Sequence, residues 1–210
     1  MNEATGIFGG AFVTVLKGLV SMHHTLYPSI PPQGIYFESL VEGAFDKVQK
    51  PWAVIKGSNR DLAGHDLLVD DKKLSIKTET GAGTDDALIA ITKLCTTERE
   101  PWAAETLVGR VLEHLARYDV ILMLRAIWKE RFIHYQLVEI PVDDLRLLET
   151  GEFKPVGRRK GRQSLGADIL LDGQVIFHIH FDGSDGKCQV RKLRLSNCTL
   201  LDEWDQRLPA

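Results

Sequence analysis

Residues 64–80 place acids, a lysine and hydroxyls close together, in the order Gly-His-Asp-Leu-Leu-Val-Asp-Asp-Lys-Lys-Leu-Ser-Ile-Lys-Thr-Glu-Thr. Two runs with alternating apolar residues flank a short charged stretch, a pattern that predicts a β-hairpin. If the turn is centred on Asp71 and Lys72, Asp66 lies directly opposite Lys77 on the neighbouring strand. The sequence therefore predicts a carboxylate and an ammonium group in contact on one sheet.

The second strand of this hairpin adds further polar groups to the same place. Because side chains alternate along a strand, Ser75, Lys77 and Glu79 lie on one face. Hydrolysis of a phosphodiester needs a metal, an activated water and a cation near the developing negative charge. Carboxylate oxygen is the ligand that Mg²⁺ prefers, and a lysine can orient the water or stabilise the pentavalent phosphorus. The hairpin could thus support metal-dependent attack on a phosphodiester.

An amphipathic helix over residues 37–48 supplies another acid. Its apolar residues recur at helical spacing and are Phe37, Leu40, Val41, Ala44, Phe45 and Val48. At about 100° per residue, Glu38 lies about 90° from the centre of the apolar face, whereas Glu42 points further out. Glu38 is therefore the preferred second metal carboxylate, together with Asp66, and Glu79 is the alternative.

Positive charge is concentrated in a later segment. Residues 151–194 contain nine Lys and Arg against five Asp and Glu, although the formal net charge of the whole chain is −3. Contacts with DNA need donors that reach phosphates and base edges. The predicted DNA contacts are Arg158, Arg159, Lys160, Arg162 and Gln163, and weaker candidates are Lys187, Arg191, Lys192 and Arg194.

These pieces together resemble the PD-(D/E)xK, or restriction-endonuclease-like, nuclease superfamily. The matching segments are the helix at residues 36–41, the acidic strand start Gly-His-Asp at 64–66 and Ser-Ile-Lys at 75–77. Further along the chain, residues 115–120 and 185–190 are similar to type II restriction enzymes. Two positions depart from the pattern. Ser75 stands where the superfamily usually has Glu or Asp, and His65, not proline, precedes Asp66.

The resemblance implies roles for the residues already singled out. Asp66 would be the metal-binding aspartate, Lys77 the catalytic lysine and Glu38 the acid from the helix. It also implies Mg²⁺ dependence, an α/β restriction-endonuclease-like core, and homodimers that cut double-stranded DNA at short palindromic sites. The leading hypothesis is a sequence-specific type II restriction endonuclease.

Helix and strand patterns elsewhere indicate a central mixed β-sheet flanked by α-helices. Helices are expected at residues 8–24, 37–48, 104–115 and 200–207, and strands at 65–70, 73–80, 119–128, 132–140 and 189–195. Asp172-Gly173 predicts a hairpin turn, and the apolar run at 87–95 is left unassigned. The inward residues of the strand after that turn are expected to be Val175, Phe177, Ile179 and Phe181.

Length and composition bound the class of protein. A chain of 210 residues with 44% hydrophobic and 26% charged residues is typical of one globular domain, here residues 1–210 with a DNA-recognition segment around 150–195. Three cysteines without metal spacing indicate reduced thiols. Neither a signal peptide nor a membrane span is expected, so we expect a cytoplasmic protein of a prokaryote.

Two other functions stay open at this point. Ser75 in place of an acid would suit a non-catalytic DNA-binding module of the same fold. His178 and His180, on one strand face with Asp182 next in line, would suit a small-molecule metallohydrolase. The glycine-rich residues 6–12 resemble the phosphate loop of nucleotidyltransferases, but the histidine pair at 23–24 follows too late for that motif.

Overall fold

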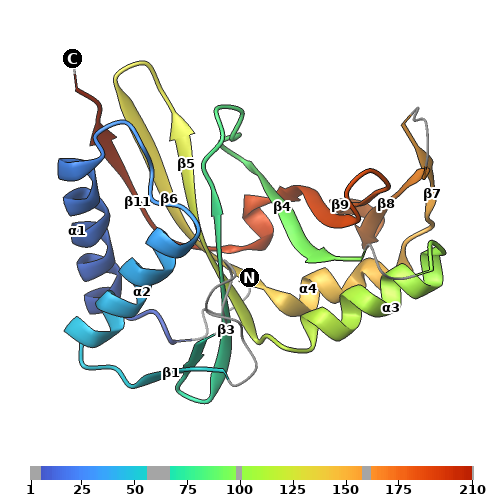
Figure 1. The fold of residues 1–210 in the computed structure, drawn as a ribbon, viewed down its shortest axis with the longest axis horizontal. Helices are drawn as coiled ribbons and strands as arrows, with labels where there is room; N and C mark the ends of the chain where they lie inside the picture. The colour runs from blue at the N-terminus through green and yellow to red at the C-terminus, as the bar shows by residue number, and fades with distance from the viewer. Residues whose placement is uncertain (1–5, 56–66, 98–100, 158–161, 210) are drawn as a thin grey trace. The chain divides into compact units, whose positions relative to one another are not determined.

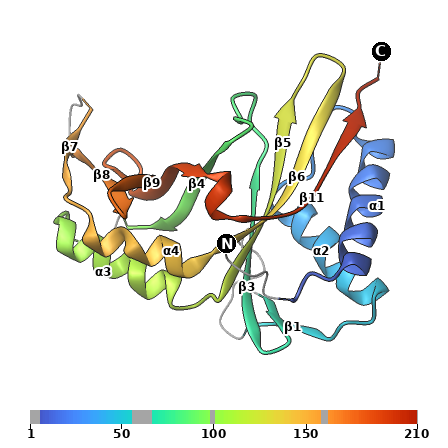
Figure 2. The same cartoon turned by 180° about the vertical axis from the view of Figure 1, so that it is seen from behind.

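The computed structural model describes residues 6–55, 67–97, 101–157 and 162–209. The chain forms two compact units (Figure 1, and from behind in Figure 2). The first unit consists of Met1–Asp86, Tyr118–Ile140 and Cys198–Ala210, and the second of Ala87–Arg117 and Pro141–Asn197. Both units are therefore assembled from segments that are far apart in the sequence.

A six-stranded mixed sheet is the centre of the first unit. Its strands, in spatial order, are β1 (Trp52–Val54), β2 (Leu67–Val69), β3 (Lys72–Glu79), β5 (Val120–Trp128), β6 (Phe132–Pro141) and β11 (Thr199–Arg207). The central pair β3–β5 is parallel, whereas β1–β2, β2–β3 and β6–β11 are antiparallel. The predicted α/β class with a central mixed sheet is confirmed.

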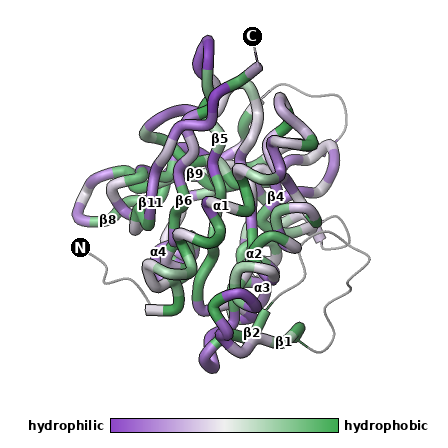
Figure 3. Tube along the Cα trace, turned by 90° about the vertical axis from the view of Figure 1, so that its left-hand side faces the viewer, coloured by the Kyte–Doolittle hydropathy of each residue, from purple (hydrophilic) through white to green (hydrophobic). Residues whose placement is uncertain are grey.

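Helices α1 (Gly10–Leu26) and α2 (Ile35–Lys47) cover one face of this sheet, and they face the viewer in Figure 3. The apolar residues that pack between helices and sheet include Phe12, Leu16, Val20, Phe37, Val41, Phe45, Leu74, Ile76, Val120 and Leu122. Each fully buried side chain of this size stabilises the fold by about 1.5–3 kcal/mol. Both helices were predicted, with ends shifted by one or two residues.

One polar pair is buried in this core. His24 Nε2 lies 2.7 Å from the Tyr135 hydroxyl, and His24 Nδ1 lies 3.1 Å from the Pro28 carbonyl oxygen. Since the carbonyl only accepts, Nδ1–H donates to Pro28 and the Tyr135 hydroxyl donates to Nε2. Burial lowers the pKa of His24 and raises the pKa of Tyr135, so both side chains stay neutral in the core.

Strand β5 lies between β3 and β6 and is buried along almost its whole length. Such two-sided burial explains why its sequence is nearly all apolar, and it confirms the predicted central strand and the hairpin with β6. The charged residue within this strand is Arg125, and its side chain is fully buried.

The second unit contains a five-stranded antiparallel sheet. Its strands, in spatial order, are β4 (Leu88–Thr96), β10 (Lys187–Arg194), β9 (Gln174–Asp182), β8 (Ser164–Leu171) and β7 (Lys154–Val156). Helix α3 (Ala104–Leu115), which coincides with its predicted bounds, packs against β4, α4 (Val142–Arg146) and the 3₁₀ helix η1 (Leu147–Thr150). A second 3₁₀ helix, η2 (Leu195–Asn197), follows β10.

Two tight turns show how local sequence fixes a hairpin. Asp172 and Gly173 have φ of 51° and 76°, the type I′ geometry that fits the twist of strands β8 and β9, as predicted. Asp70 and Asp71 have φ of 48° and 60° and form the same kind of turn between β2 and β3. The predicted turn at Asp71 and Lys72 is therefore wrong, because aspartate adopts positive φ more readily than lysine.

That correction changes the strand register. Leu67 pairs with Leu74 and Val69 with Lys72, so partner numbers sum to 141, where the predicted register required 143. The shift is two residues, which preserves the face on which each side chain lies. The predicted contact of Asp66 with Lys77 depended on the wrong register, and Asp66 itself lies outside the described residues.

The C-terminal segment was also predicted wrongly. Residues 200–207 were expected to form a helix, but they belong to β11, which pairs antiparallel with β6. The apolar residues Leu200, Leu201 and Trp204 have helix-like spacing, which explains the error. Without β11, the edge of β6 would leave its backbone groups unpaired, so sheet pairing overrides the local pattern.

In the second unit, the unassigned run at 87–95 forms β4, and the strand predicted at 189–195 is β10 with an earlier start. Phe177, Ile179 and Phe181 are buried as predicted, but Val175 is exposed beside the hairpin turn. Among the described residues, no helix is long and apolar enough to cross a membrane.

Candidate functional site

The polar residues of β3 lie on the face of the sheet that points away from α1 and α2. Leu74 and Ile76 enter the core below the helices, so the alternate residues Ser75, Lys77 and Glu79 project from the opposite face. This row of three side chains was predicted from alternation. Ser75 is fully buried, and the other two are partly buried.

The position of Glu79 is fixed by Arg125. The parallel register sets Glu79 opposite Arg125 on β5, and Arg125 Nε donates to Glu79 Oε2 at 2.7 Å. The same guanidinium donates to Gln136 Oε1 on β6 and, at 2.6 Å, to the carbonyl oxygen of Asp85. The exposed fractions of the Arg125 and Glu79 side chains are 0% and 10%, so this ion pair is shielded from water. A buried pair with several additional hydrogen bonds holds its strands in one register.

Sequence analysis missed Arg125 and Gln136. A signal was present, because Arg125 interrupts the apolar stretch of β5. A charge inside a buried strand needs a partner of opposite charge. Its partner could not be identified without the β3–β5 register, which joins segments 46 residues apart.

Ser75 stands at the position that the PD-(D/E)xK pattern usually fills with an acid. Its side chain is fully buried, and its hydroxyl has no hydrogen-bond partner within the described part of the chain. Buried polar atoms in native proteins are almost always satisfied by protein, water or an ion. The hydroxyl is therefore available for a ligand or an ordered water.

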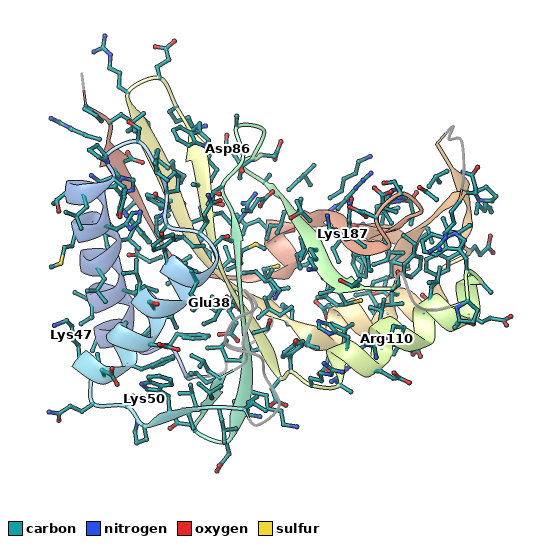
Figure 4. All side chains as sticks on the ribbon, viewed as in Figure 1. Glu38, Lys47, Lys50, Asp86, Arg110 and Lys187 are labelled. Carbon is teal, nitrogen blue, oxygen red and sulfur yellow. The ribbon has the colours of Figure 1, made fainter. Side chains whose placement is uncertain are left out.

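Glu38 is more buried than predicted, since the sequence places it between the apolar and polar faces of the helix. It is 2% exposed and lies on α2 (Figure 4), whose residues Phe37 and Val41 belong to the same core cluster as Leu74 and Ile76 of β3. A carboxylate in this setting is shielded from bulk water, as expected of a metal ligand but not of an ordinary surface acid. Asp66, the other predicted ligand, lies outside the described residues. Within the residues described, no group of three or more His, Cys, Asp or Glu could hold a metal ion.

The basic loop between β7 and β8 is held at its base. Arg158, Arg159 and Lys160 lie outside the described residues, whereas Arg162 and Gln163 are described. The Gln163 amide donates to the carbonyl oxygens of Val156 at 2.6 Å and Gly157 at 3.2 Å. This side chain therefore ties together the two ends of the loop, and its predicted contact with DNA stays a prediction.

Trp102 supports the same loop from the segment before α3. Its indole Nε1 donates to the Gln163 carbonyl oxygen at 2.6 Å, and the Arg162 guanidinium lies 4.7 Å from the centre of its ring system. Gly183 approaches so closely that a Cβ there would collide with the Arg162 carbonyl. We call these contacts of Trp102, Gln163 and Gly183 the loop clamp. It was not found from the sequence, because its members come from three distant segments.

The two histidines of β9 are not arranged like two ligands of one metal ion. His178 Nδ1 lies 2.8 Å from Asp168 Oδ1 on the neighbouring strand β8. The rings of His178 and His180 are 6.4 Å apart, and His180 is buried. This geometry gives His178 a cross-strand partner and offers little support for a metallohydrolase.

Comparison with known proteins decides between the remaining functions. The sequence model of the SmaI family, described as type II site-specific deoxyribonuclease, matches residues 1–206. The chain belongs to this family. The type II restriction enzyme SmaI of Serratia marcescens is 30% identical over 178 residues, which cover 82% of this chain and 72% of the relative. No solved structure matches the chain.

As a member of the SmaI family, the protein is a type II site-specific deoxyribonuclease, a sequence-specific endonuclease that binds double-stranded DNA. The predicted enzyme class is thereby confirmed. The family also favours a nuclease over the two alternatives, the non-catalytic DNA-binding module and the small-molecule metallohydrolase.

Proposed function

We propose that this deoxyribonuclease cuts DNA with Mg²⁺ at a PD-(D/E)xK-type site formed by Asp66, Glu38 and Lys77. The observation that carries the proposal is the polar row of β3, in which Lys77 lies between a buried hydroxyl and an acid already paired with arginine. Asp66 directly precedes β2, the antiparallel neighbour of β3. A lysine beside hairpin-borne and helix-borne acids is the arrangement that the superfamily resemblance implies.

The residues present are chemically suited to Mg²⁺. Glu38 contributes a buried carboxylate, and Ser75 contributes a buried hydroxyl that lacks a partner among the described residues. Hard oxygen ligands of this kind are the ones that Mg²⁺ prefers. Asp66 and Glu38 would hold the ion. When bound, Mg²⁺ would neutralise charge on the phosphate and make a coordinated water more acidic.

Our choice for the second carboxylate is Glu38; because α2 covers the face of the sheet opposite to Lys77, the two groups would approach the ion from different sides of β3. Glu79 already accepts a hydrogen bond from Arg125, so its negative charge is compensated within the protein. Moving Glu79 to a metal would leave the fully buried guanidinium without its ion pair, which is costly. We therefore assign Glu79 the role of fixing β3 and Glu38 the role of metal ligand.

Lys77 would act directly on the reacting phosphate. Lys77 is a partly buried residue, so its interaction with a phosphate oxygen would be less screened than in open water. Negative charge grows on the equatorial oxygens as water attacks in line, and a fixed cation stabilises that state more than the ground state. Lys77 therefore lowers the barrier to hydrolysis.

The basic loop would bind the DNA. Arg158, Arg159, Lys160 and Arg162 would contact phosphates or base edges, since arginine donates two parallel hydrogen bonds to either. Gln163 would position them through the loop clamp. Two copies of the chain would act on a short palindromic site, because the twofold symmetry of such a site matches that of a homodimer.

Plasmid cleavage tests the proposal. The purified protein is expected to produce discrete fragments with MgCl₂ and none with EDTA, and sequencing of the fragment ends would reveal whether the site is palindromic. Asp66→Asn and Glu38→Gln are expected to slow cleavage at least about 100-fold. Glu79→Gln is the matched control, because it should lower stability more than the rate at saturating Mg²⁺. Cleavage at the parent rate by Asp66→Asn would overturn the site.

A further inference from the structure

An apolar surface lies at the end of α1 and along its connection to α2. Six large hydrophobic side chains are exposed within residues 22–36: Met22, Leu26, Tyr27, Ile30, Ile35 and Tyr36. Of the other exposed large hydrophobic residues of the described chain, three lie on the β8–β9 hairpin, and β2, β4 and β11 carry one each. The rings of Tyr27 and Tyr36 lie 6.4 Å apart, so the two ends of this segment come together. Apolar side chains exposed close to one another mark a contact surface, whereas single exposed residues do not. We call these six residues the α1–α2 patch.

The patch is free of charge. Residues 18–37 contain no Asp, Glu, Lys or Arg. A DNA-binding surface needs cations for the phosphates, so this surface is unsuited to DNA. Centres of protein–protein interfaces are instead depleted of charge and enriched in Tyr and Met, which this segment has. The composition therefore points to a protein partner.

The patch is also held in one conformation. Ile30 N donates to the Tyr27 carbonyl, and His23 and His24 contact the carbonyl oxygens of Ile30 and Pro28, both at 3.1 Å. The rings of His23 and Tyr27 lie 4.9 Å apart. A connector fixed in this way loses little conformational freedom on binding, which favours association.

We infer that the α1–α2 patch is the contact between two copies of this chain. This inference rests on the proposed homodimer and names its surface. An uncharged patch meets its own twofold copy without electrostatic repulsion, as an isologous interface requires. Six side chains that are 43–74% exposed, at roughly 200 Å² each, present about 700 Å², close to the ~800 Å² per partner of a standard interface.

The second copy gives the enzyme a second active site. One strand of the duplex then reaches each site, and both strands are cut in a single encounter. A monomer would instead cut one strand and release nicked DNA. The oligomeric state and the ratio of nicked to linear plasmid are therefore two separate readouts of the same contact.

Charged substitutions in the patch test the inference on the full-length protein. Leu26→Glu and Tyr36→Glu alter residues that are 74% and 59% exposed, so both variants should keep the parent circular dichroism spectrum. Sedimentation velocity should show a dimer for the parent and a dissociation constant raised at least about 30-fold for the variants. Leu171→Glu, exposed on the β8–β9 turn of the second unit, is the matched control and should stay dimeric. The patch variants should also accumulate nicked plasmid.

Several results would overturn the inference. If the patch variants sediment as dimers, the α1–α2 patch is not the dimer contact. If the parent is monomeric at tens of micromolar, with and without cleavable DNA, the patch binds another protein. If the variants stay dimeric but lose DNA binding, the patch is a DNA-binding surface. If a variant misfolds, hydrogen exchange of the parent tests the interface. Dilution dissociates a dimer, so the amides of residues 22–36 must lose protection when the parent is diluted. Lys77→Ala should stay dimeric and should produce no nicked plasmid. Failure of the active-site proposal is therefore distinguishable from failure of the interface proposal.

Discussion

In the first unit, the guanidinium of Arg125 is fully buried and bonded to Glu79, Gln136 and a backbone carbonyl. In the second unit, Arg162 is exposed and rests on the ring of Trp102 at the base of a basic loop. The first arrangement uses one buried charge to fix three strands of a sheet. The second uses backbone contacts and an aromatic ring to hold charge at the surface.

The difference follows from what each unit is proposed to do. Bond hydrolysis needs groups fixed to a fraction of an ångström, which rigid neighbouring strands provide. Binding of a highly charged polymer needs cations that reach into solvent, where each contributes modestly and depends on salt. Substitutions in the first unit should therefore alter rate or stability, and substitutions in the second should alter affinity.

Lys77→Ala should have the largest effect. Loss of the ammonium group removes stabilisation of the phosphate charge, so we expect cleavage at least about 10²–10³-fold slower with little change in DNA affinity. Plasmid cleavage in MgCl₂ and a gel shift measure the two quantities. Lys129→Ala, which breaks an exposed ion pair with Asp86 in the same unit, is the control and should cleave like the parent. Equal loss in both variants would argue against a specific role of Lys77.

Arg125→Leu should come next, as a loss of stability. It leaves Glu79 nearly buried without its partner, so the free energy of unfolding in urea should decrease by about 3–5 kcal/mol. Adding Glu79→Leu removes the uncompensated charge and should restore more than about 1 kcal/mol. If the double variant is no more stable than the single one, the buried ion pair does not explain the register.

The loop clamp should affect binding alone. Trp102→Leu and Gln163→Ala release the ends of the basic loop, and we expect each to raise KM for the DNA about 3–10-fold while kcat is retained. Steady-state cleavage of a short duplex separates the two constants. Gln174→Ala, at the start of β9, is the control for a surface glutamine of the same unit. A fall in kcat with unchanged KM would contradict the division of roles between the units.

The smallest effect should be a pH dependence of stability from His24. Burial lowers its pKa in the folded state, so below about pH 6.5, the ordinary value of histidine, the unfolded chain binds more protons than the folded one. Stability is fully present above that pH and is lost as the pH falls toward the folded-state pKa. We expect the urea midpoint of the parent to fall between pH 7.5 and 5.5. The fall should be smaller in His24→Gln, and equal falls would exclude this histidine as the cause.

Local patterns predicted the elements that carry their own signal. The helices around Phe37 and Leu107 and the turn at Asp172 were predicted because a periodic apolar face or a turn residue suffices to define them. β11 was predicted as a helix because Leu200, Leu201 and Trp204 have helix-like spacing, while the unpaired edge of β6 that selects a strand is not visible in the sequence.

The same limit applies to the candidate site. The row of Ser75, Lys77 and Glu79 was predicted from the alternation of side chains along a strand. The register error of two residues does not affect it, because a shift of two leaves each side chain on the same face. Arg125 as the partner of Glu79 could not be predicted, because that contact depends on a parallel pairing between distant strands. The choice between Glu38 and Glu79 likewise became possible only when the ion pair with Arg125 was known.

The parallel pairing of β3 with β5 also has a consequence for the order of folding. The chain leaves the first unit after Asp86 and returns at Tyr118, so β3 and β5 meet only after a long loop has closed. Contacts of high sequence separation form slowly because the entropy of loop closure opposes them. In refolding from urea, α1 and α2 should recover their circular dichroism first. Nuclease activity should return later, at the rate at which the fluorescence of Trp128 on β5 reaches its native value.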